Sequence, residues 1–196
     1  MPHRREDNAR LRFLTKYEDP VLRTKIRELC PEREPEFDLA VYTGIRRGEQ
    51  YRLRWEDVNF EQRLLTIARS KNGAMRHLPL NASAQHALAE LYARNSHSEF
   101  VCGGVKEPRY WYQPVVIAAG LKDFTWHCLR HTFASRLVMA GVDIRTVAEL
   151  MGHKTLAVTM RYAHLAPDHQ RAAVERLEPT AIRTATSLGS QAAIVQ

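Results

Sequence analysis

The chain has 196 residues, of which 44% are hydrophobic and 26% are charged, as is ordinary for a soluble globular protein. No apolar run approaches the roughly 18 residues of a membrane span, the charged start PHRREDNAR is not a signal peptide, and three cysteines without paired spacing do not suggest a disulfide framework. The net charge of +7 favours a polyanionic partner, although charge alone fits a basic and inert surface equally well.

The first third of the chain predicts three helices after a short arm. Residues 1–12 are polar and basic, and we expect them to form a linker or arm. Thr15 and Glu18 have the spacing of a capping box, in which each side chain satisfies a backbone N–H of the other residue, so a helix should begin here. Two further helices are predicted over 34–42 and 47–55.

The middle of the chain predicts a small antiparallel sheet. Its three short apolar segments are 58–60, 64–68 and 75–80. An Asn72-Gly73 pair between the last two segments is a strong signal for a tight hairpin turn, because both residues tolerate positive φ. We therefore expect Lys71 at or beside the tip of a β-hairpin.

The second half of the chain returns to helices. Two are predicted over 82–94 and 110–119, and three short ones should follow the N-capping residues Thr125, Asp143 and Thr155. The last of these three is expected to contain the tyrosine of the sequence Met-Arg-Tyr-Ala-His-Leu.

The chain is expected to end in a final amphipathic helix from Pro167 to about Leu177 and a flexible C-terminal tail over 179–196. No internal repeat is seen. The predicted fold class is mainly α with a small antiparallel β-sheet, an α+β arrangement in one compact domain.

Several polar residues in this framework are candidates for catalytic chemistry. They are Arg46, Lys71, His127, Arg130, His153 and Tyr162. His127 and Arg130 are three residues apart and so share one helix face. The i, i+4 spacing of His127 and His131 can hold a metal ion, but no HExxH motif and no carboxylate accompany it on that helix. Taken singly, each residue is explained as a solvated charge, a helix cap or a core aromatic.

The set as a whole has no such ordinary explanation. It combines two arginines, two histidines, a lysine and a tyrosine, without an acidic pair, a Ser-His-Asp order or a phosphate-cradling glycine loop. Transesterification at a phosphodiester suits this set. Guanidinium groups neutralise the charge of the phosphorane, histidine and lysine move protons, and tyrosine forms a covalent intermediate. A free phenol has a pKa near ~10, so the tyrosine would need help from nearby cations.

At these residues the chain resembles the catalytic domain of tyrosine recombinases, also called phage integrases. The motifs are T-G-I-R-R-G-E, the hairpin lysine, H-C-L-R-H-T-F-A-S, L-M-G-H and M-R-Y-A-H-L, in this order from about Arg10 to Leu177. Each motif alone is weak, but five motifs in order and at the right spacing are specific.

The resemblance implies how the phosphate would be bound. Arg46 and Arg130 would be the paired arginines on the scissile phosphate, and His153 would hydrogen-bond to it. His127 would act as an acid/base and phosphate ligand. Glu49 falls where the family has an acidic residue that supports the first arginine.

The resemblance also implies the reaction. Tyr162 would attack the phosphate to give a 3′-phosphotyrosine, and Lys71 would protonate the 5′-oxygen that leaves. The 5′-hydroxyl of a partner strand would then attack the phosphotyrosine, so that strands are exchanged through a Holliday junction without ATP. This chemistry implies neither a cofactor nor a metal.

The resemblance further implies a domain organisation and partners. A catalytic domain over 13–178 would lie between the arm and the tail, which could dock on a neighbouring protomer. No separate core-binding domain is expected before it, so binding to double-stranded DNA should be weak and salt-sensitive. We expect a homotetramer on DNA, a monomer when free, no membrane association, and a cytoplasmic location in a bacterial or phage-encoded system.

Three alternatives stay open. A type IB topoisomerase shares the chemistry but rejoins the same strand, and the closely spaced H-x-x-R, L-M-G-H and tyrosine favour the recombinase. A non-catalytic DNA-binding remnant would keep the scaffold but need not keep the full residue set. A metal-dependent nuclease would lose its activity in EDTA. The sequence does not specify the DNA site or distinguish integration from excision, transposition or dimer resolution.

Overall fold

A computed structural model describes residues 11–67, 75–104, 108–166, 174 and 177. The chain divides into two compact units, residues 1–165 and 166–196. The predicted last helix lies almost wholly outside the described residues, and the tail lies entirely outside them. Among the described helices, none is both long and apolar enough to cross a membrane.

The N-terminal helices begin where the sequence predicts. The Glu18 N–H donates to Thr15 Oγ1 at 3.2 Å and the Thr15 N–H donates to the Glu18 carboxylate at 3.1 Å, which confirms the capping box. Helix α1 follows over Glu18–Leu29, then a short 3₁₀ turn η1 over Pro31–Arg33, and α2 over Glu34–Thr43.

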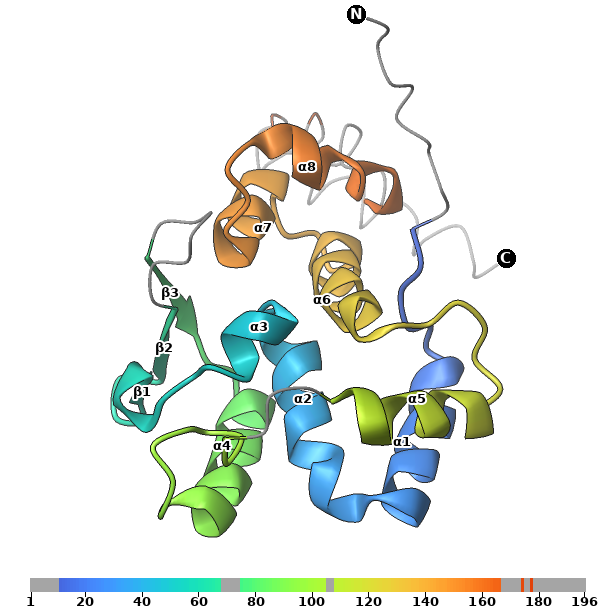
Figure 1. The fold of residues 1–196 in the computed structure, drawn as a ribbon. Helices are drawn as coiled ribbons and strands as arrows, with labels where there is room; N and C mark the ends of the chain where they lie inside the picture. Colours follow the sequence, from blue (N-terminus) through green and yellow to red (C-terminus); the bar gives the residue numbers. More distant parts are fainter. Residues whose placement is uncertain (1–10, 68–74, 105–107, 167–173, 175–176, 178–196) are drawn as a thin grey trace, which may run out of the picture. The chain divides into compact units, whose positions relative to one another are not determined.

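Helix α2 is the centre of the first unit. In Figure 1 it runs between α4 on one side and the α1–α5 pair on the other. Phe37 and Val41 belong to an apolar cluster with α1, α5 and α6, whereas Leu39 belongs to a second cluster with the sheet and α4. Seven of its ten residues are buried, so it links the two clusters.

Helix α3 covers only Arg47–Gln50, so the prediction that it continues to Trp55 was wrong. The backbone after Gln50 pairs instead with a distant segment. The Val101 N–H donates to the Leu53 carbonyl at 2.9 Å, and the Trp55 N–H donates to the Glu99 carbonyl at 3.2 Å. A 3₁₀ turn η2 follows over Trp55–Asp57.

The predicted small sheet is confirmed, with shorter strands. Strands β1 (Val58–Asn59), β2 (Leu64–Ile67) and β3 (Arg76–Pro79) are antiparallel in the order β1-β2-β3. Leu65 pairs with Leu78, and both side chains are buried. The expected hairpin tip, including Lys71, lies outside the described residues.

The two helices after the sheet also match their prediction. Helix α4 spans Ala82–Asn95, and Asn81 Oδ1 caps it by accepting from the Ala84 N–H at 2.9 Å. Helix α5 spans Arg109–Ala118 and tolerates Pro114 in its interior.

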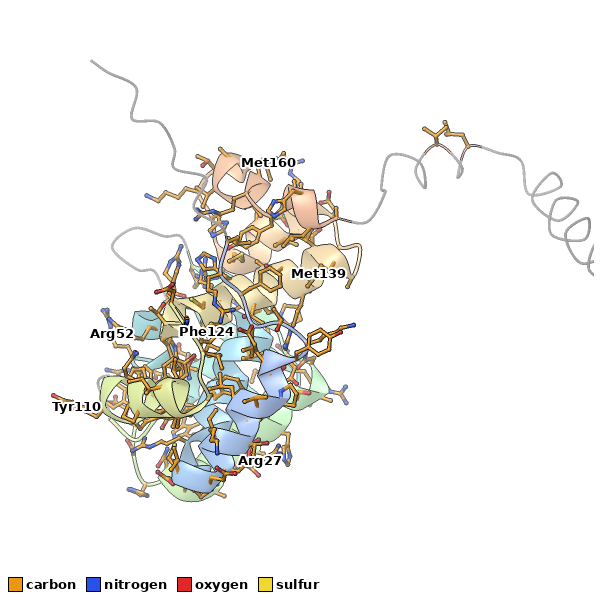
Figure 2. The ribbon with its side chains drawn as sticks, turned by 90° about the vertical axis from the view of Figure 1, so that its right-hand side faces the viewer. Arg27, Arg52, Tyr110, Phe124, Met139 and Met160 are labelled. Carbon is orange, nitrogen blue, oxygen red and sulfur yellow. The ribbon has the colours of Figure 1, made fainter. Side chains whose placement is uncertain are left out.

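The C-terminal part of the first unit is the helical group α6 (Trp126–Met139), α7 (Ile144–Met151) and α8 (Leu156–Met160). Figure 1 shows α7 and α8, in orange, stacked beyond α6, and Figure 2 shows Met139 and Met160 at this end of the unit and Arg27 of α1 at the other.

Tyr162 does not lie within α8, so that prediction was wrong. The helix ends at Met160, and Tyr162 sits in the turn between α8 and a 3₁₀ turn η3 over Ala163–Leu165. Its N–H donates to the Thr159 carbonyl at 3.0 Å, and its own carbonyl accepts from the Leu165 N–H at 2.9 Å. These three-residue spacings are those of tight turns and 3₁₀ structure.

Candidate active site

Two arginines from different elements meet at the C-terminal end of α7. Arg130, on α6, is buried and donates to the Gly44 carbonyl at 2.6 Å and to the Met151 carbonyl. Arg46, at the start of α3, donates to the Gly152 carbonyl at 3.2 Å. The last carbonyls of a helix lack partners within the helix and carry partial negative charge. The end of α7 therefore holds both cations side by side.

This convergence depends on close backbone approach at Gly44. The residue has a φ of +60°, and a Cβ added to it would lie 2.3 Å from Cδ1 of Phe133 on α6. Only glycine adopts this conformation without strain and leaves room for the ring. The absence of a side chain lets the end of α2 rest on α6, so that the Gly44 carbonyl reaches Arg130.

Glu49 orients Arg46. Its carboxylate accepts from the Arg46 backbone N–H and from the Arg46 guanidinium, both at 2.9 Å, and from the Arg76 guanidinium at 2.7 and 3.2 Å. Burial alone would raise the pKa of the Glu49 carboxyl, but the hydrogen bonds from Arg76 and Arg46 lower that pKa to about 2. Glu49 is therefore ionised throughout the physiological range.

Two predicted histidines lie in the field of these arginines. Burial, followed by the charges of Arg130 and Arg46, lowers the pKa of His153 to about 4 and also lowers the pKa of His127. His153 Nδ1 lies 2.7 Å from Thr159 Oγ1, a bond that fixes the ring. A phosphate among these groups would add negative charge and so favour the protonated imidazoles.

Tyr162 is buried, with only 1% of its surface exposed. Its hydroxyl lies 2.6 Å from His131 Nδ1, and the His131 ring stacks edge-on against His127 at a centroid distance of 4.6 Å. Burial, only partly opposed by Arg130 and Arg161, raises the pKa of Tyr162 to about 12. The phenol is therefore neutral throughout the physiological range.

The structure thus brings together five of the six predicted catalytic residues, which come from four parts of the fold. The predicted supporting residue Glu49 lies among them. The sixth, Lys71, lies outside the described residues. Within the described ranges, no three His, Cys, Asp or Glu residues gather where they could share a metal ion.

Sequence reasoning missed His131 as the partner of Tyr162 and Arg76 as the partner of Glu49. Arg76 had a usable signal. It lies two residues before the buried Leu78 on β3, and alternate residues of a strand share a face. His131 had no such signal, because its contact spans 31 positions of the chain.

Comparisons with known proteins agree on one family. The family described as "Phage integrase family" matches residues 13–169. A tyrosine recombinase XerC from Roseiflexus sp. (strain RS-1) is 31% identical over 93% of this chain and 64% of the relative. The integrase of Salmonella phage P22 is 31% identical over 83% of this chain and 46% of the relative. The chain spans about half to two thirds of the length of these relatives.

Solved structures agree with the sequence relatives. The catalytic domain of bacteriophage HP1 integrase is 26% identical, with a TM-score of 0.69 over 87% of this chain and 97% of that chain. The Tn1549 transposon integrase in complex with transposon right end DNA has the same fold, with a TM-score of 0.70 over 84% of this chain and 65% of that one at 21% identity. The fold is that of a tyrosine recombinase catalytic domain, and the chain belongs to the phage integrase family.

Proposed function

We propose that this chain is a site-specific DNA recombinase that cleaves and rejoins DNA strands through a 3′-phosphotyrosine intermediate. One observation carries the proposal. Arg46 and Arg130 are held together on the backbone carbonyls at the end of α7, beside two neutral imidazoles. Two adjacent guanidiniums repel each other unless an anion lies between them, and a phosphodiester is the anion that bidentate arginines bind best.

The arginines would bind the non-bridging oxygens of the scissile phosphate. An arginine has five N–H donors, and the bonds from Arg130 to Gly44 and Met151 orient its guanidinium while leaving donors for a phosphate. Negative charge grows on these oxygens as the phosphorane forms, so the two cations stabilise the transition state more than the ground state. His153 would add a hydrogen bond to the same oxygens.

Tyr162 would supply the nucleophile. Its oxygen would attack the phosphorus, the bond from phosphorus to the 5′-oxygen would break, and a 3′-phosphotyrosine and a 5′-hydroxyl would result. The phenol proton would pass to an imidazole, for which His127 is the candidate, and Lys71 would protonate the leaving 5′-oxygen. Attack by the 5′-hydroxyl of a partner strand reverses these steps and conserves the bond energy.

Partners and assembly follow from the same proposal. The substrate would be double-stranded DNA in the cytoplasm of a bacterium, bound by a catalytic domain over 13–178 that assembles as a homotetramer and is a monomer when free. The tail over 179–196, rich in small and aliphatic residues, would dock on a neighbouring protomer. Sedimentation of the DNA complex, with and without residues 179–196, tests this, and a monomer in both cases would contradict it.

The cleavage step is tested with a pool of duplexes that carry randomised sequence beside a nick. Cleavage near a nick releases a short fragment that diffuses away, so the covalent protein–DNA adduct is trapped. We expect an adduct with the 196-residue chain and none with Tyr162→Phe. An adduct that persists in Tyr162→Phe would contradict the assignment of the nucleophile.

Two simple readouts test the alternative functions. Relaxation of a supercoiled plasmid without recombinant products would favour a type IB topoisomerase. Loss of cleavage in EDTA would favour a metal-dependent nuclease, and the proposal predicts no loss. A chain that binds DNA but never forms the adduct would be a DNA-binding remnant.

A further inference from the structure

Arg76, on the inward face of β3, contacts Glu49 of α3 and the end of α7, whose last carbonyls hold the two site arginines. Its guanidinium forms a two-pronged bond to the Glu49 carboxylate of α3, with Nη2 to Oε2 at 2.7 Å and Nη1 to Oε1 at 3.2 Å. Its Nε donates to the Leu150 carbonyl in α7 at 3.3 Å. The side chain therefore joins the sheet, the Arg46 turn and the end of α7.

Arg76 packs against the backbone before His153. A Cβ added to Gly152 would lie 2.9 Å from both Cδ and Nη1 of Arg76. Only 11% of the Arg76 side chain is exposed, compared with 40% for Arg46. Arg46 thus faces solvent, where DNA would lie, whereas Arg76 lies behind it with its donors on Glu49 and α7.

The charges show why a second arginine is useful here. A single carboxylate paired with Arg46 would orient it but would also cancel most of its charge toward a phosphate. Glu49 is instead shared between Arg46 and Arg76, so the three groups together keep a net positive charge. Because the pairs are partly desolvated, this sharing is screened less than at an open surface.

We propose that Arg76 is a positioning residue for strand cleavage: acting through Glu49, it fixes the Arg46 guanidinium against the end of α7 and keeps it cationic toward the phosphate. This role rests on the proposed function, but the order that Arg76 imposes on Arg46 exists in the free protein. Arg76 itself does not touch the DNA.

The first test compares Arg76→Met with the unchanged chain in the nicked-duplex assay. We expect adduct formation at saturating DNA to slow by at least about tenfold, because small misplacements at a reacting centre are costly. The Kd for DNA should change by less than about threefold, since Arg76 makes no DNA contact. Arg76→Lys should restore part of the rate, because it returns the charge without the two-pronged geometry.

A double-mutant cycle with Glu49→Gln separates this role from a direct one. If Arg76 acts through Glu49, Arg76→Met should slow the Glu49→Gln protein by less than about threefold. Full additivity of the two effects would overturn the proposal. Loss of DNA affinity with an unchanged rate at saturation would overturn it as well, because it would make Arg76 a DNA ligand.

Arg23→Met is the matched control. Arg23 is also mostly buried, with 16% of its side chain exposed, and it forms ion pairs with Asp19, Glu34 and Asp38, none of which is a proposed site residue. Its loss should lower stability without changing the adduct rate of the folded protein. Equal slowing by the Arg23 and Arg76 variants would reduce the effect to general destabilisation and overturn the proposal.

A readout without DNA keeps this inference separate from the proposed function. The Nε–H signal of Arg46 in ¹⁵N NMR reports whether that side chain is ordered. We expect an ordered signal in the unchanged chain and a mobile one in Arg76→Met. An ordered Arg46 side chain in Arg76→Met would refute the positioning role. If Arg46 instead becomes mobile in Arg76→Met, and the unchanged chain forms no adduct with DNA, only the recombinase function is refuted.

Discussion

The buried phenol of Tyr162 and its bond to His131 define the resting state of the proposed nucleophile. Only 1% of the Tyr162 surface is exposed, so its hydroxyl cannot contact a phosphate in this position. The 2.6 Å contact with His131 Nδ1 satisfies the phenol and a half-buried imidazole together. If Tyr162 is the nucleophile, as we propose, DNA or a neighbouring protomer would have to break this contact before cleavage.

Tyr162→Phe should therefore cost stability as well as activity. The change removes the hydroxyl and leaves His131 Nδ1 without that partner, which costs about 1 kcal/mol of unfolding free energy. Urea denaturation measures the cost. Tyr92→Phe is the control, because Tyr92 is 50% exposed and should lose only a few tenths of a kcal/mol at most. A Tyr162→Phe protein as stable as the Tyr92→Phe protein would mean that the contact contributes nothing.

The histidines of the site should make the fold sensitive to acid. Burial lowers the pKa of His131 and of His153 from 6.5 to about 4. Between pH 6.5 and about 4, the unfolded chain therefore binds more protons than the folded chain. The contribution of these histidines to the free energy of unfolding is complete above pH 6.5 and is lost as the pH falls toward about 4. The pKa of the Glu49 carboxyl is lowered from 4.5 to about 2. Protonation of Glu49 therefore lowers the free energy of unfolding further as the pH falls from 4.5 to about 2.

Urea midpoints across this pH range check the prediction. His131→Gln should flatten part of the slope between pH 6.5 and 4. A midpoint that stays constant from pH 6.5 to 4.5 in the unchanged chain would show that these imidazoles are not held neutral by burial.

At the scale of elements, the site is assembled by helix ends and by one close backbone crossing. The carbonyl end of α7 holds Arg46 and Arg130, and the crossing at Gly44 brings the end of α2 onto α6. No single helix contains the site. Its geometry therefore depends on how α2, α6 and α7 pack.

Gly44→Ala should be more damaging than a glycine substitution that meets only backbone strain. Gly104 also has positive φ, but a Cβ there would meet nothing within 4 Å. Gly104→Ala should cost about 1–2 kcal/mol from the left-handed conformation alone. Gly44→Ala adds a collision with Phe133, worth a further 1–3 kcal/mol or so, and should weaken adduct formation. If urea denaturation gives the same loss of unfolding free energy for both variants, the contact between the end of α2 and α6 has room for a methyl group.

Most elements could be predicted from the sequence because their signals are local. The capping box at Thr15, the cap at Asn81 and the strand alternation each act within a few residues. The length of α3 could not be predicted, because its end is set by pairing between Leu53 and Val101. The turn position of Tyr162 likewise depends on a distant partner, His131, which local periodicity does not reveal.

The candidate site shows the same division. Spacing and residue type were enough to single out Arg46, Arg130, His127, His153 and Tyr162. Their ordered appearance along the chain also indicated the family, which the match over residues 13–169 confirms. Strand alternation could have placed Arg76 on the inward face of β3, but its pairing with Glu49 depends on three-dimensional packing. The same holds for the support from Thr159 and the carbonyls of α7, which spacing does not reveal.

At the scale of the whole molecule, charge would govern the proposed binding to DNA. The net charge of the chain is +7. Binding that relies on phosphate contacts weakens with salt by a slope of about −0.9 per phosphate neutralised. We expect the affinity for DNA to be nearly lost between ~50 and ~200 mM salt, as fluorescence anisotropy with a labelled duplex would show. Nanomolar binding that does not change with salt would contradict this.

Peptide mapping of the trapped adduct tests most directly whether this chain performs phosphotyrosine chemistry. The adduct from the nicked-duplex pool is digested with protease and nuclease, and mass spectrometry locates the residual nucleotide. The predicted result is a 3′-phosphodiester on Tyr162 and a free 5′-hydroxyl on the released strand. A nucleotide linked to any other residue, or cleaved DNA with no protein attached, would contradict the proposed mechanism.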